Sequence, residues 1–419
     1  MKRSAFPEKG MSADALFSEM EAARANDVDW KRGRVGLYVH YAGEDVLAVA
    51  KEASQRFFSE NALGPKAFPS LKKFEDDVVD WALDLLHAPP TGTGVMTSGG
   101  TESLFLALAT ARDWARAAHP SITKPEIVIP ASAHPAFDKA AHYLGLDVKR
   151  LPLRDDYRAD VDAMAAAITP NTILVAGSAP AFPHGVIDPI ATIAALARQH
   201  GVWCHVDACV GGFMAPFVKR AGYAVPPFDF EIEGVTSISA DLHKYGFTAK
   251  GASLLLLADT AMRKYLEFDF DNWPRGRYKS ATFRGTRPGG AIASAWAVMR
   301  YLGLEGYTRI ARTTMQGRDR LIAGIESLDG FQVVGEPDLT VIGYGATGLD
   351  IDAVAQALGE RGWFVTGMAS PPGIHMGMLS PAHAAVVDEY LADLRAAVAT
   401  VRSRGDSSPV KAMDHSYGG

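Results

Sequence analysis

The sequence predicts an α/β fold with two parts, a large domain built on a mainly parallel sheet and a smaller α/β domain at the carboxyl end. Strand-like and helical segments alternate through the middle of the chain, which is the pattern of parallel strands joined by helices. A second alternating set follows a long helical segment. The 419 residues exceed one simple core, and 48% hydrophobic with 21% charged residues is an ordinary globular composition.

The composition also excludes some classes of partner. A formal net charge of −6 leaves no broad basic field for nucleic acid or anionic lipid. No apolar run reaches the roughly 18 residues of a membrane-spanning helix, and the first residues lack the apolar core of a secretory signal. Cys204 and Cys209 are the only cysteines, which excludes a disulfide framework. We therefore expect a cytoplasmic enzyme without an integral membrane segment.

The first residues predict a helical arm. Leu16, Met20 and Ala23 recur at helical spacing, which indicates an amphipathic helix that ends near Asn26. Such an arm often packs on a partner subunit. A second helix is expected over Glu44–Asn61.

The segment 33–43 lies between these helices and is glycine-rich and aromatic, which favours a loop. Its Tyr38, His40 and Tyr41 could line a site, or they could simply pack. After a glycine–proline break, a long helix over Leu71–Leu86 is expected to pack on the main domain. The face that it would bury carries Phe74, Val78, Trp81 and Leu85.

A run of small polar residues comes next, from Gly92 to Ser103, and leads directly into a helix predicted over Leu104–Ala118. Adjacent glycines with Ser and Thr at a helix start leave backbone N–H groups free and add hydroxyl donors, which suits a phosphate. The run lacks the Gly-x-Gly-x-x-Gly spacing of dinucleotide folds and the lysine of a Walker loop. An ordinary helix cap is the alternative.

The alternating elements of the large domain follow. The predicted strands are Glu126–Pro130, Asp147–Leu151, Ile173–Gly177, Trp203–Asp207, Ser237–Ser239 and Ala252–Leu257. The helices between them include Ala136–Leu144, Asp160–Ile168 and Pro189–His200.

One of these strands ends in a carboxylate. Asp207 lies at the carboxyl end of an apolar strand, where α/β folds place ligand-binding groups. A carboxylate there can pair with a protonated pyridinium nitrogen. The rival is a metal site formed with Cys204, His205 and Cys209, which the period-two geometry disfavours because it sends the two cysteines to opposite faces.

A lysine opens a glycine-punctuated turn between two strand-like runs. Lys244 follows His243, and its amine is well placed at a strand end to act as a nucleophile. Pyridoxal 5′-phosphate (PLP) needs a lysine that forms a Schiff base, and burial beside a second cation lowers the pKa of such a lysine. Lys250 is the candidate for that cation. The alternative is an ordinary surface lysine.

The last third of the chain begins with a helix predicted over Thr260–Phe268. Residues 269–290 then predict a long irregular loop, which is cationic and suited to anionic groups or simply solvated. A long helix over Tyr307–Leu328 leads to the small domain. Its predicted strands are Phe331–Val334, Thr340–Tyr344 and Trp363–Thr366, and its predicted helices are Ile351–Glu360 and Ala382–Val401.

We accordingly divide the chain into four segments. These are a helical arm (1–60), a large cofactor-binding domain (61–300), a small domain (301–402) and a polar tail (403–419) that we expect to be mobile.

Several motifs together resemble the PLP-dependent sphingosine-1-phosphate lyase family, within the fold-type I, group II decarboxylase-like enzymes. The motifs are Thr97-Ser-Gly-Gly-Thr-Glu-Ser103, Ser132-Ala-His134, Phe182-Pro-His-Gly-Val-Ile-Asp-Pro189, His205-Val-Asp-Ala-Cys209, Gly234-Val-Thr-Ser-Ile-Ser-Ala-Asp-Leu-His-Lys-Tyr-Gly246 and Arg287-Pro-Gly-Gly290. The resemblance extends from about Gly33 to about Met376. It implies a PLP-dependent transferase-like fold with a seven-stranded type of sheet.

The resemblance also implies roles for single residues. Lys244 would form the Schiff base, Asp207 would pair with the ring nitrogen, and His134 would stack on the ring. The other cofactor-binding positions that it implies are Ser98, Gly99, Gly100, Thr101, Ser178, His243, Gly289 and Gly290. The last two would come from the second subunit, which implies a homodimer with shared sites.

Further positions concern the reaction and the substrate. Tyr41 and Lys250, together with His134 and Lys244, fall at the family's catalytic positions. The substrate-binding positions that we infer are Asn61, Tyr38 and Arg284.

The chain also departs from the family pattern. Gly64 stands where the family has a histidine near the polar end of the substrate, and Ala179 stands where a threonine is usual. The triplet Tyr38-Val-His40 is bulkier than the family's Gly-Ala-Val, and Arg284 replaces a small residue. These departures concern the substrate and leave the cofactor chemistry in place.

Three functions are compatible with these residues. The first is a carbon–carbon lyase that cleaves a phosphorylated 2-amino-3-hydroxy, sphingoid-base-like compound to phosphoethanolamine and an aldehyde. The second is an amino-acid decarboxylase or an aldolase for β-hydroxy amino acids. The third is a PLP-binding protein without turnover, which the joint presence of Lys244, Asp207 and Lys250 disfavours.

Overall fold

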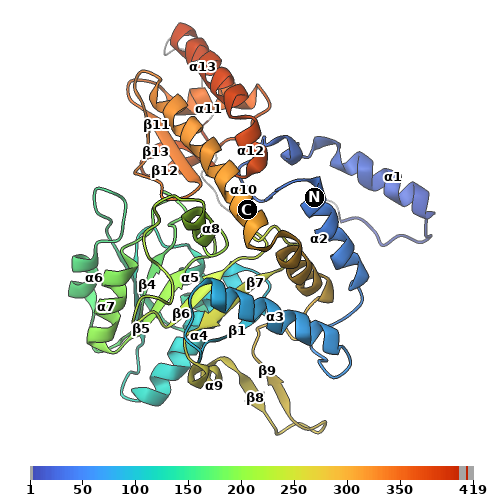
Figure 1. Cartoon of the computed structure of the whole chain (residues 1–419), viewed down its shortest axis with the longest axis vertical. Helices are drawn as coiled ribbons and strands as arrows, with labels where there is room; N and C mark the ends of the chain where they lie inside the picture. Colours follow the sequence, from blue (N-terminus) through green and yellow to red (C-terminus); the bar gives the residue numbers. More distant parts are fainter. Residues whose placement is uncertain (1–2, 405–411, 414–419) are drawn as a thin grey trace.

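The computed structural model describes residues 3–404 and 412–413 (Figure 1). It contains a seven-stranded sheet, a four-stranded sheet nearer the carboxyl end and a short two-stranded hairpin. The predicted α/β fold with a mainly parallel sheet is therefore confirmed. The predicted polar tail falls almost entirely outside the described residues.

The large sheet has the strand order β1-β7-β6-β5-β4-β2-β3. Strands β2 to β6 run parallel, while β7 is antiparallel to both of its neighbours, β1 and β6. The bounds are β1 Thr93–Thr97, β2 Glu126–Pro130, β3 Asp147–Leu151, β4 Thr172–Ser178, β5 Trp203–Asp207, β6 Ser237–Ala240 and β7 Ser253–Leu257.

Helices cover both faces of this sheet, because its central strands are apolar on both sides. On β2, Val128 belongs to one buried cluster, while Ile127 and Ile129 belong to the other. The first cluster includes residues of α3, α7 and α10, and the second includes residues of α4 and α5. The bounds are α3 Pro69–Leu85, α4 Gly100–Ala118, α5 Ala136–Leu144, α6 Val161–Ala167, α7 Ile190–His200, α8 Ala215–Arg220, α9 Arg263–Leu266 and α10 Gly289–Glu326.

Helix α10 joins the two sheets, as Figure 1 shows. Its helical geometry is interrupted at Gly303, whose φ of +54° suits a residue without a side chain. Near its start, Trp296 stacks on Phe74 of α3 with 4.4 Å between the ring centroids, and Trp81 lies close by. The predicted apolar face of α3 is thus used against α10 as well as against the sheet.

The smaller sheet has the order β10-β11-β13-β12 and is entirely antiparallel. Its buried cluster is filled from α11, α13 and the end of α10. The bounds are β10 Phe331–Val333, β11 Val341–Ala346, β12 Thr366–Ala369, β13 Pro372–Met378, α11 Ile351–Gly359, α12 Pro381–Ala385 and α13 Val387–Arg404.

The structure corrects several predicted elements. The segment read as a phosphate loop begins with a strand, β1, and β13 was missed. The predicted strand Trp363–Thr366 lies three residues too early, because β12 spans Thr366–Ala369. The helix predicted over Thr260–Phe268 is only a short turn, η3 (Thr260–Met262), followed by α9.

The predicted irregular loop 269–290 is also partly ordered. Strand β8 (Phe268–Phe270) pairs with β9 (Tyr278–Ser280), and α10 already begins at Gly289. Isolated short strands and a helix that starts with two glycines give weak sequence signals, because pairing and packing stabilise them more than local propensity does.

The amino-terminal arm stands apart from the core. Helix α1 (Ala13–Ala23) has no buried residue, and Leu16, Phe17 and Met20 are exposed. In Figure 1 it projects from the body of the protein. Short 3₁₀ turns, η1 (Arg24–Asn26) and η2 (Trp30–Arg32), lead to α2 (Glu44–Arg56), which packs on α10.

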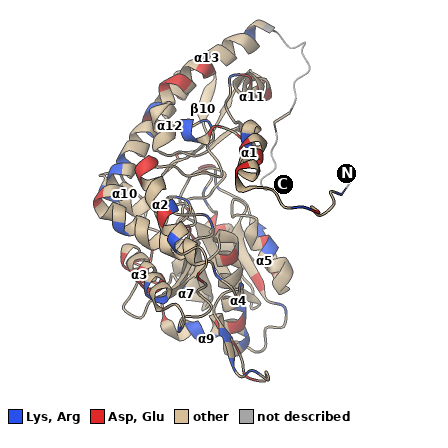
Figure 2. Cartoon of the chain, turned by 90° about the vertical axis from the view of Figure 1, so that its right-hand side faces the viewer, with Lys and Arg blue, Asp and Glu red and all other residues tan. Residues whose placement is uncertain are grey.

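Charged residues of both signs are interspersed over the helices, as Figure 2 shows. This distribution agrees with the absence of a broad basic field in the sequence. Within the described ranges, no helix is both long and apolar enough to cross a bilayer.

A pair of glycines tests the packing of α10. A Cβ on Gly317 would lie 2.4 Å from the Cβ of Ala384 in α12, whereas a Cβ on Gly359 of α11 would meet no atom within 4 Å. We expect Gly317→Ala to lower the free energy of unfolding by about 1–3 kcal/mol through overpacking. The matched change Gly359→Ala should raise it by about 0.5–1 kcal/mol. Urea denaturation measures the free energy of unfolding of both variants. Equal changes in the two variants would contradict the close packing of Gly317 on Ala384.

Candidate active site

A cavity of about 350 Å³ opens at the carboxyl edge of the large sheet. Parallel strands bring their carboxyl ends to one edge, so the turns after β2, β4, β5 and β6 meet the start of α4 there. The lining residues are Ser98, Gly99, Gly100, Thr101, Glu102, Leu104, His134, Ser178, Pro180, Phe182, Asp207, Cys209, Val210, Asp241, His243 and Lys244.

The start of α4 forms one wall of the cavity. No side chain caps this helix end, whose N-cap is Gly99. A Cβ on Gly100 would lie 2.7 Å from Cys209 Sγ and 3.1 Å from each carboxylate oxygen of Asp241. Only glycine therefore allows this approach, and the backbone N–H groups of the first turn of α4 remain suited to an anion. The predicted phosphate-binding residues 98–101 all lie here.

Asp207 ends β5 at the floor of the cavity and is 8% exposed. Its Oδ1 accepts hydrogen bonds from the backbone N–H of Cys209 (3.1 Å) and the hydroxyl of Ser239 (3.3 Å). These donors fix the carboxylate at the strand end. Ser178, at the end of β4, is the register partner of Asp207 and also lines the cavity.

The rival metal site does not form. Cys204 is buried in the hydrophobic cluster, and His205 bonds to Ser237 through Nδ1 at 2.7 Å. In the described part of the chain, the one cluster with metal-ligand geometry is His87, Asp229 and Glu231, elsewhere in the fold.

His134 lies in the turn after β2, and its ring is fixed from the following helix. The backbone N–H of Ala136 donates to His134 Nδ1 at 3.1 Å. Burial lowers the pKa of His134, so its imidazole is neutral at physiological pH. A neutral, partly buried ring at the cavity wall can stack on a flat ligand.

Lys244 is held by a buried ion pair that sequence reasoning missed. Its Nζ lies 2.8 Å from Asp241 Oδ2, and the Asp241 side chain is 1% exposed. Burial by itself lowers the pKa of Lys244, but the Asp241 carboxylate outweighs it and the net shift is upward. The expectation of a lowered pKa at Lys244 is therefore wrong for the protein without ligand. The sequence signal that could have revealed this ion pair is the aspartate three residues before Lys244.

The lowered pKa belongs to Lys250 instead. This residue is exposed as a whole, but its Nζ donates inward to the carbonyl of His243 at 3.1 Å. Desolvation and the nearby Lys244 lower the pKa of Lys250 to about 8. His243 accepts a hydrogen bond from the backbone N–H of Ala252 through Nδ1 at 3.2 Å, and burial lowers its pKa.

Tyr41 lies in a neighbouring cavity of about 450 Å³ that it lines together with His40 and Lys250. Its hydroxyl donates to Glu44 Oε1 at 2.9 Å, and desolvation with this carboxylate raises the pKa of Tyr41. Tyr38 lies apart: it is 53% exposed, with its ring edge-on to Phe364.

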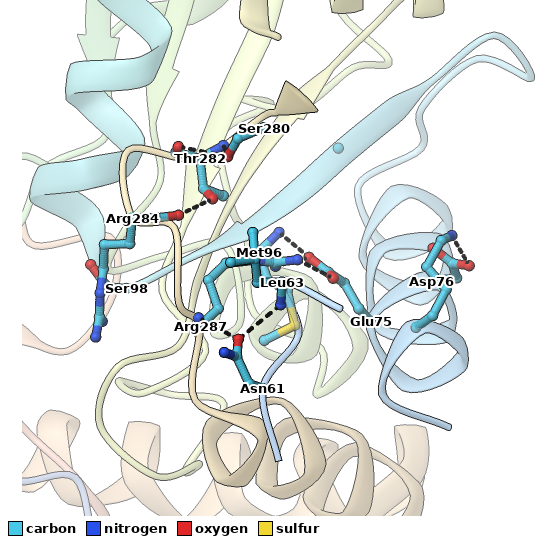
Figure 3. A network of polar contacts seen from close by, with 12 residues as sticks. Asn61, Leu63, Glu75, Asp76, Met96, Ser98, Ser280, Thr282, Arg284 and Arg287 are labelled. Atoms are coloured by element: carbon cyan, nitrogen blue, oxygen red, sulfur yellow. Dashed lines mark hydrogen bonds and ion pairs between the residues drawn. The ribbon is translucent and has the colours of Figure 1, made fainter. Parts of the chain in front are cut away.

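The remaining predicted residues belong to a polar network beside the cavity (Figure 3). Asn61 Oδ1 accepts from the backbone N–H groups of Leu63 (2.9 Å) and Arg287 (3.3 Å). The Arg287 guanidinium in turn pairs with Glu75. Arg284 lines a narrow crevice with Ser98, on the flank of the α4 start.

Gly289 and Gly290 begin α10 and pack within their own protomer. A Cβ on Gly290 would lie 2.7 Å from Ser54 Oγ of α2, and one on Gly289 would lie 2.8 Å from the carbonyl of Glu60. Neither glycine lines the cavity that holds Lys244.

Comparison with known proteins places this geometry in a family. The family described as pyridoxal-dependent decarboxylase conserved domain matches residues 1–346. A sphingosine-1-phosphate lyase of Arabidopsis thaliana is 40% identical over 96% of this chain and 75% of its own length. The chain belongs to the sphingosine-1-phosphate lyase family, within the PLP-dependent decarboxylases.

Two further proteins are similar to this chain over most of its length. The structure of a Burkholderia pseudomallei sphingosine-1-phosphate lyase has a TM-score of 0.92 and 34% identity, covering 96% of this chain and 94% of its own. A probable L-tyrosine/L-aspartate decarboxylase of Methanocella arvoryzae is 35% identical over 93% of this chain and 99% of its own length.

Membership implies PLP, and the cavity suits it. The uncapped start of α4 could receive the phosphate, and the His134 ring could cover the pyridine. The buried Asp207 carboxylate is fixed where a ring nitrogen would need a negative partner. Among the described residues, Asp241 Oδ1 is buried without a hydrogen-bond partner, beside the Lys244 amine that a bound aldehyde would engage.

Lys250 offers a direct test of the electrostatics. In the cofactor-free protein, roughly half of its amine should be neutral near pH 8, compared with well under 1% of a free lysine side chain. The neutral fraction of any amine rises with pH, and the lowered pKa of Lys250 moves this rise to lower pH than in a free lysine. Brief acetylation across a pH series, read by mass spectrometry beside free N-acetyl-lysine, measures it. If the acetylation of Lys250 depended on pH in the same way as that of N-acetyl-lysine, the lowered pKa of Lys250 would be contradicted.

Proposed function

We propose that the protein is a PLP-dependent carbon–carbon lyase that cleaves a phosphorylated 2-amino-3-hydroxy compound to phosphoethanolamine and an aldehyde. The observation that carries the proposal is Lys250, an amine with a lowered pKa held one hydrogen bond from the residue before Lys244. A retro-aldol cleavage needs a base for a hydroxyl proton, and a group with a pKa near 8 suits that task.

The residues that line the cavity have different roles in this reaction. Lys244 is the residue whose amine would hold the cofactor's aldehyde, and Asp207 would supply a negative charge to its ring nitrogen. PLP, when bound, draws off the electron pair that the broken carbon–carbon bond leaves behind. His134, at the cavity wall, would stack on the cofactor ring.

The base acts on the hydroxyl group of C3, the carbon that becomes the aldehyde. Lys250 in its neutral form takes the proton of the C3 hydroxyl, and the bond between C2 and C3 breaks. A proton then returns to C2, which gives phosphoethanolamine. Tyr41, in the cavity next to Lys250, is the nearby hydroxyl that could relay this proton.

The substrate phosphate needs cationic partners. Gly64 carries no side chain where the family has a histidine, and Arg284 lies on the flank of the α4 start. We assign Arg284 to the polar end of the substrate, with Asn61 and Tyr38 as less direct contributors through the neighbouring loops.

We also propose that the protein forms a homodimer. Helix α1 exposes Leu16, Phe17 and Met20 and buries nothing within the protomer, which is costly unless a partner covers it. In such a dimer, Gly289 and Gly290 could approach the cofactor of the second subunit.

One observation favours a second function, α-decarboxylation of an amino acid. The archaeal relative named a probable L-tyrosine/L-aspartate decarboxylase matches this chain over almost its whole length. Loss of carbon dioxide needs no base for a hydroxyl proton, so Lys250 would have no task in it. Carbon dioxide release from a panel of amino acids separates the two functions.

Product analysis tests the lyase directly. With phosphorylated sphingoid bases, mass spectrometry should find an aldehyde and phosphoethanolamine in equal amounts. Lys244→Ala should lose both the products and the visible absorbance of the bound cofactor. Lys72→Ala on the exposed face of α3 serves as a control that keeps both. No aldehyde from any such substrate would reject this function.

Removal of the charge at 207 tests the electron sink. Asp207→Asn keeps the size of the side chain, so the folded state should survive, while turnover should fall by roughly 10²-fold or more. Asp162→Asn, at an exposed carboxylate on α6, is the matched control. Full turnover in Asp207→Asn would exclude the proposed pairing with the ring nitrogen.

A further inference from the structure

His40 places an imidazole beside the candidate active site. It lines the cavity of about 450 Å³ that Tyr41 and Lys250 also line. Among the described residues, both ring nitrogens of His40 are buried and have no hydrogen-bond partner. Buried polar groups are paired with few exceptions, because an unpaired one loses its hydrogen bonds to water. A buried, unpaired imidazole at the wall of a cavity therefore indicates a partner on a ligand.

Packing fixes the ring of His40. The ring lies edge-on to that of Tyr245, with 5.2 Å between the centroids. Tyr245 is itself held in place, since its hydroxyl donates to the carbonyl of Leu379 at 2.7 Å. Because Tyr245 directly follows Lys244 in the chain, this contact places His40 beside the turn that carries the lysine. The position of the imidazole is thus set without any hydrogen bond from its nitrogens.

The ionisable groups around His40 are basic. They are Lys250, Lys244, His243 and His383. Burial, and after it the charge of Lys250, hold the pKa of His40 well below its usual range. The ring is therefore neutral at physiological pH and has one N–H donor and one acceptor nitrogen. Such an N–H group can donate to an oxygen atom on which negative charge develops.

Lys250 links the cavity of His40 to the cavity that holds Lys244. It lines the first, and its Nζ donates to the carbonyl of His243, which lines the second. In the proposed lyase reaction, Lys250 takes the proton of the C3 hydroxyl. A substrate oxygen within reach of Lys250 then lies in the space that His40 also lines.

We propose that His40 donates its ring N–H to the C3 oxygen of the substrate. This inference rests on the proposed lyase function and deepens it, because it adds a second residue at the oxygen that Lys250 deprotonates. The proton passes to Lys250, and the C2–C3 bond breaks and leaves its electron pair with C2. The oxygen carries negative charge until its double bond to C3 is complete, and the hydrogen bond from His40 stabilises that charge.

Two substitutions at position 40 test the hydrogen bond in the cofactor-loaded protein with a sphingoid-base phosphate. His40→Val introduces the residue of the family pattern and removes the donor. We expect its kcat for aldehyde formation to fall by roughly 10²-fold with little change in KM, because the donor acts on charge that develops during the reaction. His40→Gln retains an N–H donor and should recover part of this loss.

A second ligand separates this role from a structural one. The same sphingoid-base phosphate without its 3-hydroxyl group has no proton for Lys250 to take, and it serves as a competitive inhibitor. His40→Val should leave its inhibition constant unchanged, since the compound has no C3 oxygen. His200→Val makes the same change at the exposed end of α7 and should alter neither turnover nor inhibition. Visible absorbance verifies that every variant holds the cofactor.

Three results would overturn the inference. The first is an unchanged kcat in His40→Val, and the second is a His40→Gln variant no more active than His40→Val. The third is an equal loss of turnover and of inhibitor binding, which would show that His40 only maintains the shape of the cavity. Failure of the lyase function is distinct, because the unmodified protein would then form no aldehyde, and the inference would be rejected with it.

Discussion

The buried pair of Lys244 and Asp241 is the interaction on which the site depends. An ammonium group so little exposed would not stay charged without a carboxylate beside it, and a carboxylate so buried needs a cation in turn. The pair brings the end of β6 to the start of α4, where Gly100 lies against the Asp241 oxygens. It also raises the pKa of Lys244 and thereby makes the neighbouring Lys250 easier to deprotonate.

The large sheet explains why these residues meet. Its central strands are buried on both faces, so polar side chains within them must be paired, as the His205 and Ser237 pair is. Ligand-binding groups are left to the strand ends and the turns beyond them. Asp207, Ser178 and His134 each follow a different strand, and they converge because parallel strands end at one edge.

The small sheet reaches the edge of the large sheet that carries the candidate cofactor residues. Strand β12 and His375 line a cavity of about 780 Å³ together with His134. Helix α10, held against α3 by the stacked rings of Phe74 and Trp296, connects this sheet to the large one.

The sequence by itself determined the α/β fold, most strands of the large sheet and the candidate cofactor residues, because strand periodicity and short polar motifs are local signals. It did not reveal β1, the β8–β9 hairpin or the early start of α10, since these elements depend on pairing and packing with distant segments. Only the tertiary structure showed that Asp241 raises the pKa of Lys244 and that Lys250 carries the lowered one. The physical reason is that a pKa depends on burial and on charges close in space, which the order of residues does not state.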